Sequence, residues 1–264
     1  MQRAWDKYNN GMRNYFRSQK LLLRTLPFVA AIIAVKYAAH YFGYEVIELN
    51  ALFTSFVAAN VFLLGFLLAG VLADFKESEK LPGELSVSLE SIAEEANLLY
   101  QAKNIKEAAL CLAHMRMLIA CFREWFHKKE RTHVLFTHLS TLNKLIADLE
   151  PHTQANFIVR LKQEQANLRR IVTRIDTIRD TSFVSSGYRI AEINSILLIL
   201  GLIGIKLEPF LHALFLTGAV SLLFLYMMFL IKDLDNPFGY YSGGSVENVP
   251  IKVIEELEER VKNY

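Results

Sequence analysis

Hydrophobic residues are concentrated in two long runs without charged side chains, one in each half of the chain. The first run covers residues 51–73, which are 23 consecutive uncharged residues, and the second covers residues 213–231, which are 19. A helix of about 20 apolar residues crosses the roughly 30 Å of hydrocarbon in a bilayer. We therefore predict two membrane-spanning helices, at residues 51–73 and 210–231.

Two further apolar segments are interrupted by polar residues. The first, residues 21–43, carries four such interruptions: Arg24, Pro27, Lys36 and His40. The second has only 13 uncharged residues, 193–205, before Lys206, but it reaches spanning length if Lys206 extends its side chain to the interface. We predict the third span at residues 189–207, and residues 206–209 then join it to the last span as a helical hairpin.

The region between the second and third spans, residues 74–188, is polar and has apolar residues at every third or fourth position. This spacing is typical of amphipathic helices, and the sequence shows neither an alternating strand pattern nor an internal repeat. Pro151 and His152 mark a break between two helical stretches. The predicted fold class is an all-α integral membrane protein with four transmembrane helices and a helical cytosolic region between the second and third spans.

Lysine and arginine residues predict the orientation in the membrane. Six of them lie in the first 24 residues, seventeen between Asp74 and Arg189, and four after Ile231, whereas the linkers 44–50 and 206–209 hold none and one. Because cytoplasmic loops are rich in lysine and arginine, the N-terminal segment 1–20, the middle region and the C-terminal segment 232–264 are predicted to be cytoplasmic. We expect a multi-pass protein of the plasma (cell inner) membrane, with no cleaved signal peptide.

Composition and motifs argue against several other classes of protein. The net charge of +2 is too small to indicate a nucleic-acid partner. The two cysteines, Cys111 and Cys121, lie about 15 Å apart along a helix, so we expect free, reduced thiols. No phosphate-binding glycine loop, zinc-protease motif or serine-hydrolase motif is present, so the chain is not expected to be an enzyme.

The second span contains two faces that single it out. Gly65, Ala69 and Ala73 are spaced four residues apart and form a ladder of small residues on one helix face. Such a ladder lets another helix approach closely. An adjacent face carries the residues Ala58, Phe62 and Phe66. Periodicity alone favours lipid contact for these aromatic rings, because lipid accepts any apolar surface.

Polar side chains within or beside the spans provide further candidates. Lys36, Lys206 and Asn60 could attract anions, but lysines also reach toward the interface without such a role, and membrane asparagines usually bond across helices. Asp233 and Asp235 are weak candidates for calcium, since solvated carboxylates are also common at a helix end. We expect no other metal or cofactor.

Two stretches resemble bestrophins. FLLGFLLAGVLADFKESEKLP, residues 62–82, is similar to the second membrane helix of that family, and IKDLDNPFGY, residues 231–240, resembles the segment that follows its last membrane helix. The shared motif there consists of Asn236, Pro237, Phe238 and Gly239. Bestrophins continue with an acidic run that completes a calcium clasp, whereas YYSGG follows Gly239 here, so the resemblance does not extend to calcium gating.

The resemblance implies a homopentamer in the lipid bilayer that conducts chloride and other small anions. It places Phe62 and Phe66 in a narrow neck on the central axis, with Ala58 one turn earlier. A phenylalanine-lined neck loses water easily, so larger, weakly hydrated anions should pass more readily than chloride. A secondary carrier would require repeated halves, which this chain lacks. The alternative left open is a non-conducting membrane scaffold that binds partners through its cytosolic helices.

Overall fold

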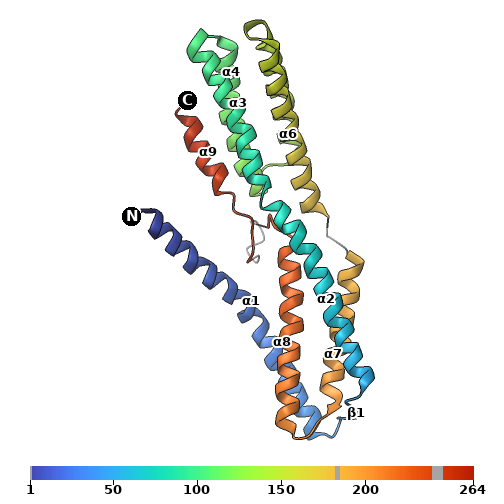
Figure 1. The fold of residues 1–264 in the computed structure, drawn as a ribbon. Coiled ribbons are helices and arrows are strands. Elements are labelled where there is room, and N and C mark those ends of the chain that lie inside the picture. The colour runs from blue at the N-terminus through green and yellow to red at the C-terminus, as the bar shows by residue number, and fades with distance from the viewer. Residues whose placement is uncertain (1, 182–184, 240–245) are drawn as a thin grey trace. The chain divides into compact units, whose positions relative to one another are not determined.

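The computed structural model describes residues 2–181, 185–239 and 246–264, and these are almost entirely helical (Figure 1). This confirms the predicted all-α fold class. The described elements are α1 (Gln2–Tyr41), β1 (Ile47–Glu48), α2 (Ala51–Ser78), α3 (Leu81–Lys103), α4 (Lys106–Phe126), α5 (Thr132–Asp148), the 3-10 helix η1 (Glu150–His152), α6 (Ala155–Asp180), α7 (Ser185–Gly204), β2 (Ile205–Lys206), α8 (Phe210–Leu234) and α9 (Lys252–Lys262).

The chain divides into two compact units. The first unit contains Met1–Asp74 and Ser182–Asp235, and the second contains Phe75–Thr181 and Asn236–Tyr264. Four helical segments, which include α1, α2, α7 and α8, are long and apolar enough to cross a membrane. Their described bounds extend past the predicted spans at the end of α2, at the start of α7 and at the end of α8, because polar residues continue the helices beyond the apolar runs.

In the first unit, α1 packs along α8, and α7 contacts both of them. The rings of Phe28 in α1 and Phe229 in α8 meet edge to face, with centroids 5.8 Å apart. The guanidinium carbon of Arg24 lies 5.5 Å from the centroid of the same Phe229 ring. This charged residue of the apolar segment therefore makes a cation–π contact. Phe53 of α2 lies against Gly201 of α7.

A buried lysine holds the linker between α1 and α2. The Lys36 side chain has no exposed surface, and its Nζ lies 2.5 Å from Oε1 of Glu45 in that linker. The same ammonium group donates hydrogen bonds to the carbonyl oxygens of Ile203, at 3.2 Å, and Ile205. His40 completes this linker clasp, with its Nδ1 2.7 Å from Oε2 of Glu45.

Two short strands extend the linker clasp, which is defined by Lys36, His40 and Glu45. Strand β1 pairs in parallel with β2, so that Ile47 lies opposite Ile205 and Glu48 opposite Lys206. The sequence did not predict this pairing, because two residues are too few to show an alternating pattern. The linker is therefore joined to the end of α7 by both backbone and side-chain contacts.

The clasp determines the ionisation of Glu45. Burial alone would raise the pKa of this carboxyl group, but the hydrogen bonds from His40 and Lys36 and the charge of Lys36 outweigh it and hold the pKa below its usual value. A lowered pKa in the folded protein means that the carboxylate stabilises the fold above the ordinary glutamate pKa. That stabilisation is lost as the pH falls through the lowered value.

The second unit is a helical bundle with a continuous core. Helix α3 packs on α4 and α6, α5 packs on α4 and α6, and α9 packs on α3 and α4. The turn η1 separates α5 from α6 at the place where Pro151 and His152 indicated a break. The sequence analysis did not identify α9, whose buried residues Ile254, Leu257 and Val261 follow one helical face.

Both cysteines lie in α4 and are free, which confirms the predicted thiols. Cys111 is buried, and burial raises the pKa of its thiol to about 12. Burial, together with the charge of Glu130, also raises the pKa of Cys121. Both groups therefore remain protonated at neutral pH and act as small apolar side chains.

We predict that breaking the linker clasp destabilises the protein more than removing it. Lys36→Met leaves a buried carboxylate, and Glu45→Gln leaves a buried ammonium group, so each should lower the free energy of unfolding by roughly 3–5 kcal/mol. The double variant leaves neither charge and should recover most of the loss. Thermal unfolding of the four proteins in detergent measures this; equal and additive losses would show that the two groups do not act as a pair.

Candidate functional site

Helix α2 has a buried face and an uncovered face within the protomer. Asn60, Leu64, Leu67 and Val71 are buried. On the other side, the side chains of Phe62 and Phe66 are 77% and 61% exposed. The uncovered side also holds the small residues singled out from the sequence, and we call this set the open face of α2: Ala58, Phe62, Gly65, Phe66, Ala69 and Ala73.

Among the described residues, the small-residue ladder is exposed and Gly65 faces open space. A Cβ atom added to Gly65 would meet no atom within 4 Å, whereas one added to Gly201 of α7 would lie 2.7 Å from the Phe53 ring. The protomer therefore uses Gly201, and not Gly65, for the close approach of its own helices. The open face of α2 is therefore exposed in the described part of the chain.

The open face differs chemically from the exposed faces of the other apolar helices. Four of its six residues are alanine or glycine. The exposed large residues of α7 are all aliphatic: Ile190, Ile193, Ile196, Leu197 and Leu200. Those of α8 are similar: Leu211, Phe215, Leu216 and Leu223. Large aliphatic surfaces suit lipid, whereas small residues are typical of helix interfaces in membranes.

The three candidates for attracting anions do not gather on the open face. Lys36 is enclosed in the linker clasp, so the structure gives it a role in holding the linker instead of presenting a free charge. Asn60 is buried on the opposite side of α2 and donates to the carbonyl oxygen of Phe56 at 3.0 Å, within its own helix. Lys206 is exposed in β2, with Nζ 3.9 Å from a carboxylate oxygen of Glu208.

The Asn236–Gly239 motif anchors the chain in the second unit. The Phe238 side chain is fully buried, and its ring centroid lies 5.9 Å from that of Phe126. The backbone N–H of Val249 donates to the carbonyl oxygen of Pro237 at 2.9 Å, and that of Gly239 donates to Asn236 at 3.2 Å. The motif therefore holds this part of the chain in the bundle through the buried Phe238 ring.

Arg179, near the end of α6, lies over the Phe238 ring and over two neighbouring aromatic rings. The Arg179 guanidinium lies over three rings, at 4.3 Å from Trp125, 5.6 Å from Phe126 and 5.8 Å from Phe238. It also donates to the backbone carbonyls of Trp125 and Phe126, at 3.3 and 3.1 Å. We call these four residues the arginine cage, and no local sequence signal pointed to it, because its members are far apart along the chain.

Asp233 lies in the last turn of α8, and Asp235 directly follows the helix. Asp235 accepts a hydrogen bond from the Tyr188 hydroxyl at 2.7 Å. Within residues 2–181, 185–239 and 246–264, no three histidine, cysteine, aspartate or glutamate side chains form a group that could hold a metal ion. The whole YYSGG segment, residues 240–244, lies outside the described residues.

Solved structures reveal which fold this is. The chain matches a mutant of a bacterial bestrophin homolog from Klebsiella pneumoniae with a TM-score of 0.72 and 15% identity over 92% of this chain and 98% of that chain. A second mutant of a bestrophin homolog from the same organism gives 0.73 and 16%, and a third gives 0.73 and 15%, with the same coverage. No protein-family profile and no curated protein matches the sequence. The fold is therefore bestrophin-like, and its apolar helices are those of a membrane protein.

We predict that Phe238→Ala destabilises the second unit by roughly 3–5 kcal/mol, because it removes a fully buried ring and leaves a cavity beneath Arg179. Phe136→Ala is the matched control, since Phe136 also lies beneath an arginine but is half exposed. Its cost should be clearly smaller. Denaturant unfolding followed by tryptophan fluorescence measures both variants, and equal losses would contradict a special role for Phe238.

Proposed function

We propose that this chain forms a homopentameric ion channel that conducts chloride and other small anions through a neck lined by Phe62 and Phe66. The observation that carries the proposal is the open face of α2, which exposes two phenylalanines next to small residues that its own protomer leaves unused. The bestrophin-like fold supports it, because the motif resemblance and the structural likeness concern the same helices.

Five copies of the open face would enclose a hydrophobic constriction. The Phe62 and Phe66 rings would point toward the shared axis, with Ala58 one turn away, while Gly65, Ala69 and Ala73 let neighbouring helices close around them. Such a constriction holds water weakly, so an ion crosses only when it gives up part of its hydration shell. Ring edges carry partial positive charge, and edges turned to the axis favour an anion over a cation.

Passage through such a neck would need neither a cofactor nor a chemical reaction, in keeping with a channel instead of an enzyme. The distribution of lysine and arginine supports a plasma-membrane protein with both termini in the cytoplasm. The second unit would then lie on the cytoplasmic side. Lys36 is left out of the ion pathway, since Glu45 already neutralises it.

We predict that Phe62→Ala and Phe66→Ala change conductance and anion selectivity when the protein is reconstituted into bilayers. Removing either ring widens and wets the neck, so the preference for bromide over chloride should fall and the conductance should rise. Phe215→Ala is the matched control, because Phe215 is equally exposed, at 72%, but lies on the aliphatic face of α8. That variant should conduct as the unmodified protein does.

Ion gradients separate the possible results of this experiment. A reversal potential that follows the chloride gradient supports the proposal, and one that follows a sodium gradient contradicts anion selectivity. If Phe62→Ala, Phe66→Ala and Phe215→Ala all behave alike, the aromatic residues of α2 do not form the neck.

The assembly itself gives an independent prediction. Gly65→Leu adds a large side chain where the protomer has open space, so it should leave the thermal stability of the protomer unchanged while weakening assembly. Native mass spectrometry in detergent should show a pentamer for the unmodified protein and smaller species for Gly65→Leu. A monomer or dimer in the unmodified protein would contradict the channel and favour the non-conducting scaffold.

A further inference from the structure

Two histidines meet between α4 and α5 in the second unit. His114 of α4 is buried, and its Nε2 lies 3.0 Å from the backbone carbonyl oxygen of His138 in α5. The centroids of the two imidazole rings are 5.4 Å apart. Because a carbonyl oxygen only accepts hydrogen bonds, Nε2 of His114 must carry the proton and act as the donor. This hydrogen bond links the two helices.

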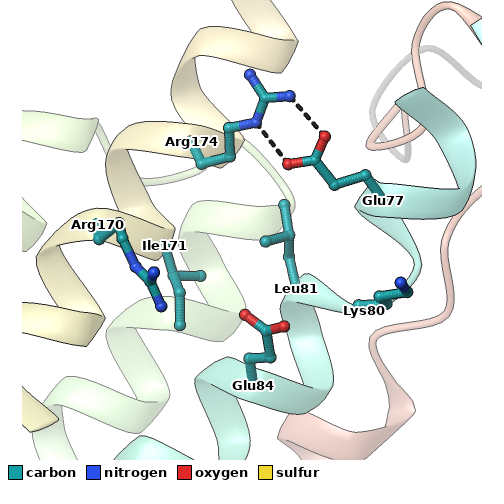
Figure 2. A pocket seen from close by; sticks show the side chains of 7 residues that line it. All are labelled: Glu77, Lys80, Leu81, Glu84, Arg170, Ile171 and Arg174. Carbon is teal, nitrogen blue, oxygen red and sulfur yellow. Dashed lines mark hydrogen bonds and ion pairs between the residues drawn. The ribbon is translucent and has the colours of Figure 1, made fainter. Parts of the chain in front are cut away.

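The contact differs from two ion pairs that join neighbouring helices elsewhere in this unit. Figure 2 shows Arg174 of α6, which donates two hydrogen bonds to the carboxylate of Glu77, at 2.9 and 2.7 Å. Arg160 of α6 likewise pairs with Glu95 of α3. In those pairs each charge meets the opposite charge, whereas a protonated His114 would lie beside another basic ring.

Charged side chains of the other helices that pack on α4 have partners of their own. Helices α3 and α9 contact α4 together with α5. Glu90 of α3 pairs with Arg260 of α9, at 2.6 Å. Glu258 of α9 pairs with Arg123 of α4, at 2.8 Å. The charges of these two helices are therefore compensated by other groups than His114.

The surroundings of His138 supply positive charge. On α6, Lys162 donates to Oδ1 of Asn143 at 2.7 Å, and Arg169 donates to the hydroxyl oxygen of Ser140 at 2.9 Å, and both acceptors belong to α5. The turn η1 begins about 18 Å along α5 from His138. Among the described residues, no carboxylate forms an ion pair with His138. A second proton on the histidine pair would therefore meet no compensating negative charge.

Burial gives His114 a preference for the neutral form. It lowers the pKa of the imidazole below the ordinary value of 6.5, and the charge of His138 lowers it further, although the hydrogen bond to the backbone acts in the opposite direction. The unfolded chain therefore takes up a proton at His114 at a higher pH than the folded protein does. Stability that depends on neutral His114 is complete above the ordinary histidine pKa and is lost as the pH falls below it.

We propose that the contact between His114 and His138 is a proton-sensitive link, which holds α4 to α5 at neutral pH and loosens when acid protonates the pair. Double protonation places two like charges on rings whose centroids are 5.4 Å apart, at a position where His114 is largely shielded from water. Water screens such charges poorly at a buried site, so the repulsion is strong there.

The link responds to acid in a pH range in which the ion pairs of the same unit persist. The hydrogen bonds from Arg174 hold the pKa of Glu77 below its ordinary value of 4.5. The pair drawn in Figure 2 therefore stays ionised while the imidazoles titrate. Measurements between about pH 7.5 and about pH 5.5 thus report on histidines and not on these carboxylates.

Amide hydrogen exchange of the full-length protein in detergent tests the link, with rates corrected for the intrinsic effect of pH on exchange. We expect peptides from α4 and α5 to exchange faster at the lower pH. The increase should reach up to about tenfold for each pH unit below the ordinary histidine pKa, because opening takes up one proton. This measurement does not use conductance, so its failure is distinct from failure of the proposed channel.

Three variants separate the contributions of the histidines. His114→Gln keeps an N–H donor near the position of Nε2 but cannot be protonated, so the acid-dependent exchange of α4 and α5 should disappear. His138→Gln removes the neighbouring charge and leaves His114 buried, so the dependence should weaken without disappearing. His133→Gln is the matched control, because His133 is an exposed histidine of the same helix α5 and should not affect the link.

The possible results either support or overturn the link. If His114→Gln does not fold, exchange of the imidazole C2 hydrogen gives the titration midpoint of His114 directly. A midpoint below that of His133, which rises in His138→Gln, would support the link. Unchanged acid dependence in His114→Gln, a His114 midpoint equal to that of His133, or full acid dependence in His138→Gln would overturn it.

Discussion

A fully buried ammonium group must be neutralised where it lies, and in this protein that requirement fixes the linker between α1 and α2. Lys36 recruits Glu45 from the linker and two carbonyl oxygens from the end of α7, and the β1–β2 pairing secures the same connection. Helix α2 begins at Ala51, only six residues after Glu45. The clasp therefore limits how far the start of α2 can lie from α1 and from the end of α7.

Within the first unit, large aliphatic residues and small residues are used for different purposes. Leu64, Leu67 and Val71 of α2 pack inside the protomer, and the isoleucines and leucines exposed on α7 suit lipid. Helix α2 exposes a surface of alanine, glycine and phenylalanine. Because hydrocarbon gives no driving force for helices to associate, such a surface gains stability only through close packing with another protein surface. Among the residues that the structure describes, the open face of α2 stays exposed.

The sequence predicted those parts of the structure that depend on local patterns. Two uncharged runs and two interrupted apolar segments predicted four helices that could cross a membrane, and the three- and four-residue spacing predicted the helical second unit. Two motifs indicated the bestrophin-like fold. Contacts between distant residues could not be predicted in this way. Lys36 meets Ile203 across 167 residues, so a pattern reading offered only an anion site or a surface position for it. For the related reason that spacing does not reveal which face of a helix is covered, the burial of Asn60 could not be predicted.

The arginine cage has a consequence for the connectivity of the chain. Arg179 precedes α7 and Phe238 follows α8, yet the guanidinium of one lies over the ring of the other. The α7–α8 hairpin therefore belongs to a segment of roughly sixty residues whose two ends are held together by the contact between Arg179 and Phe238. Bringing together the ends of a segment of this length costs chain entropy, which the contact offsets. In topological terms, the hairpin is an insertion into the second unit. A cut in the backbone at its turn, residues 206–209, would leave both fragments tethered to the same cluster.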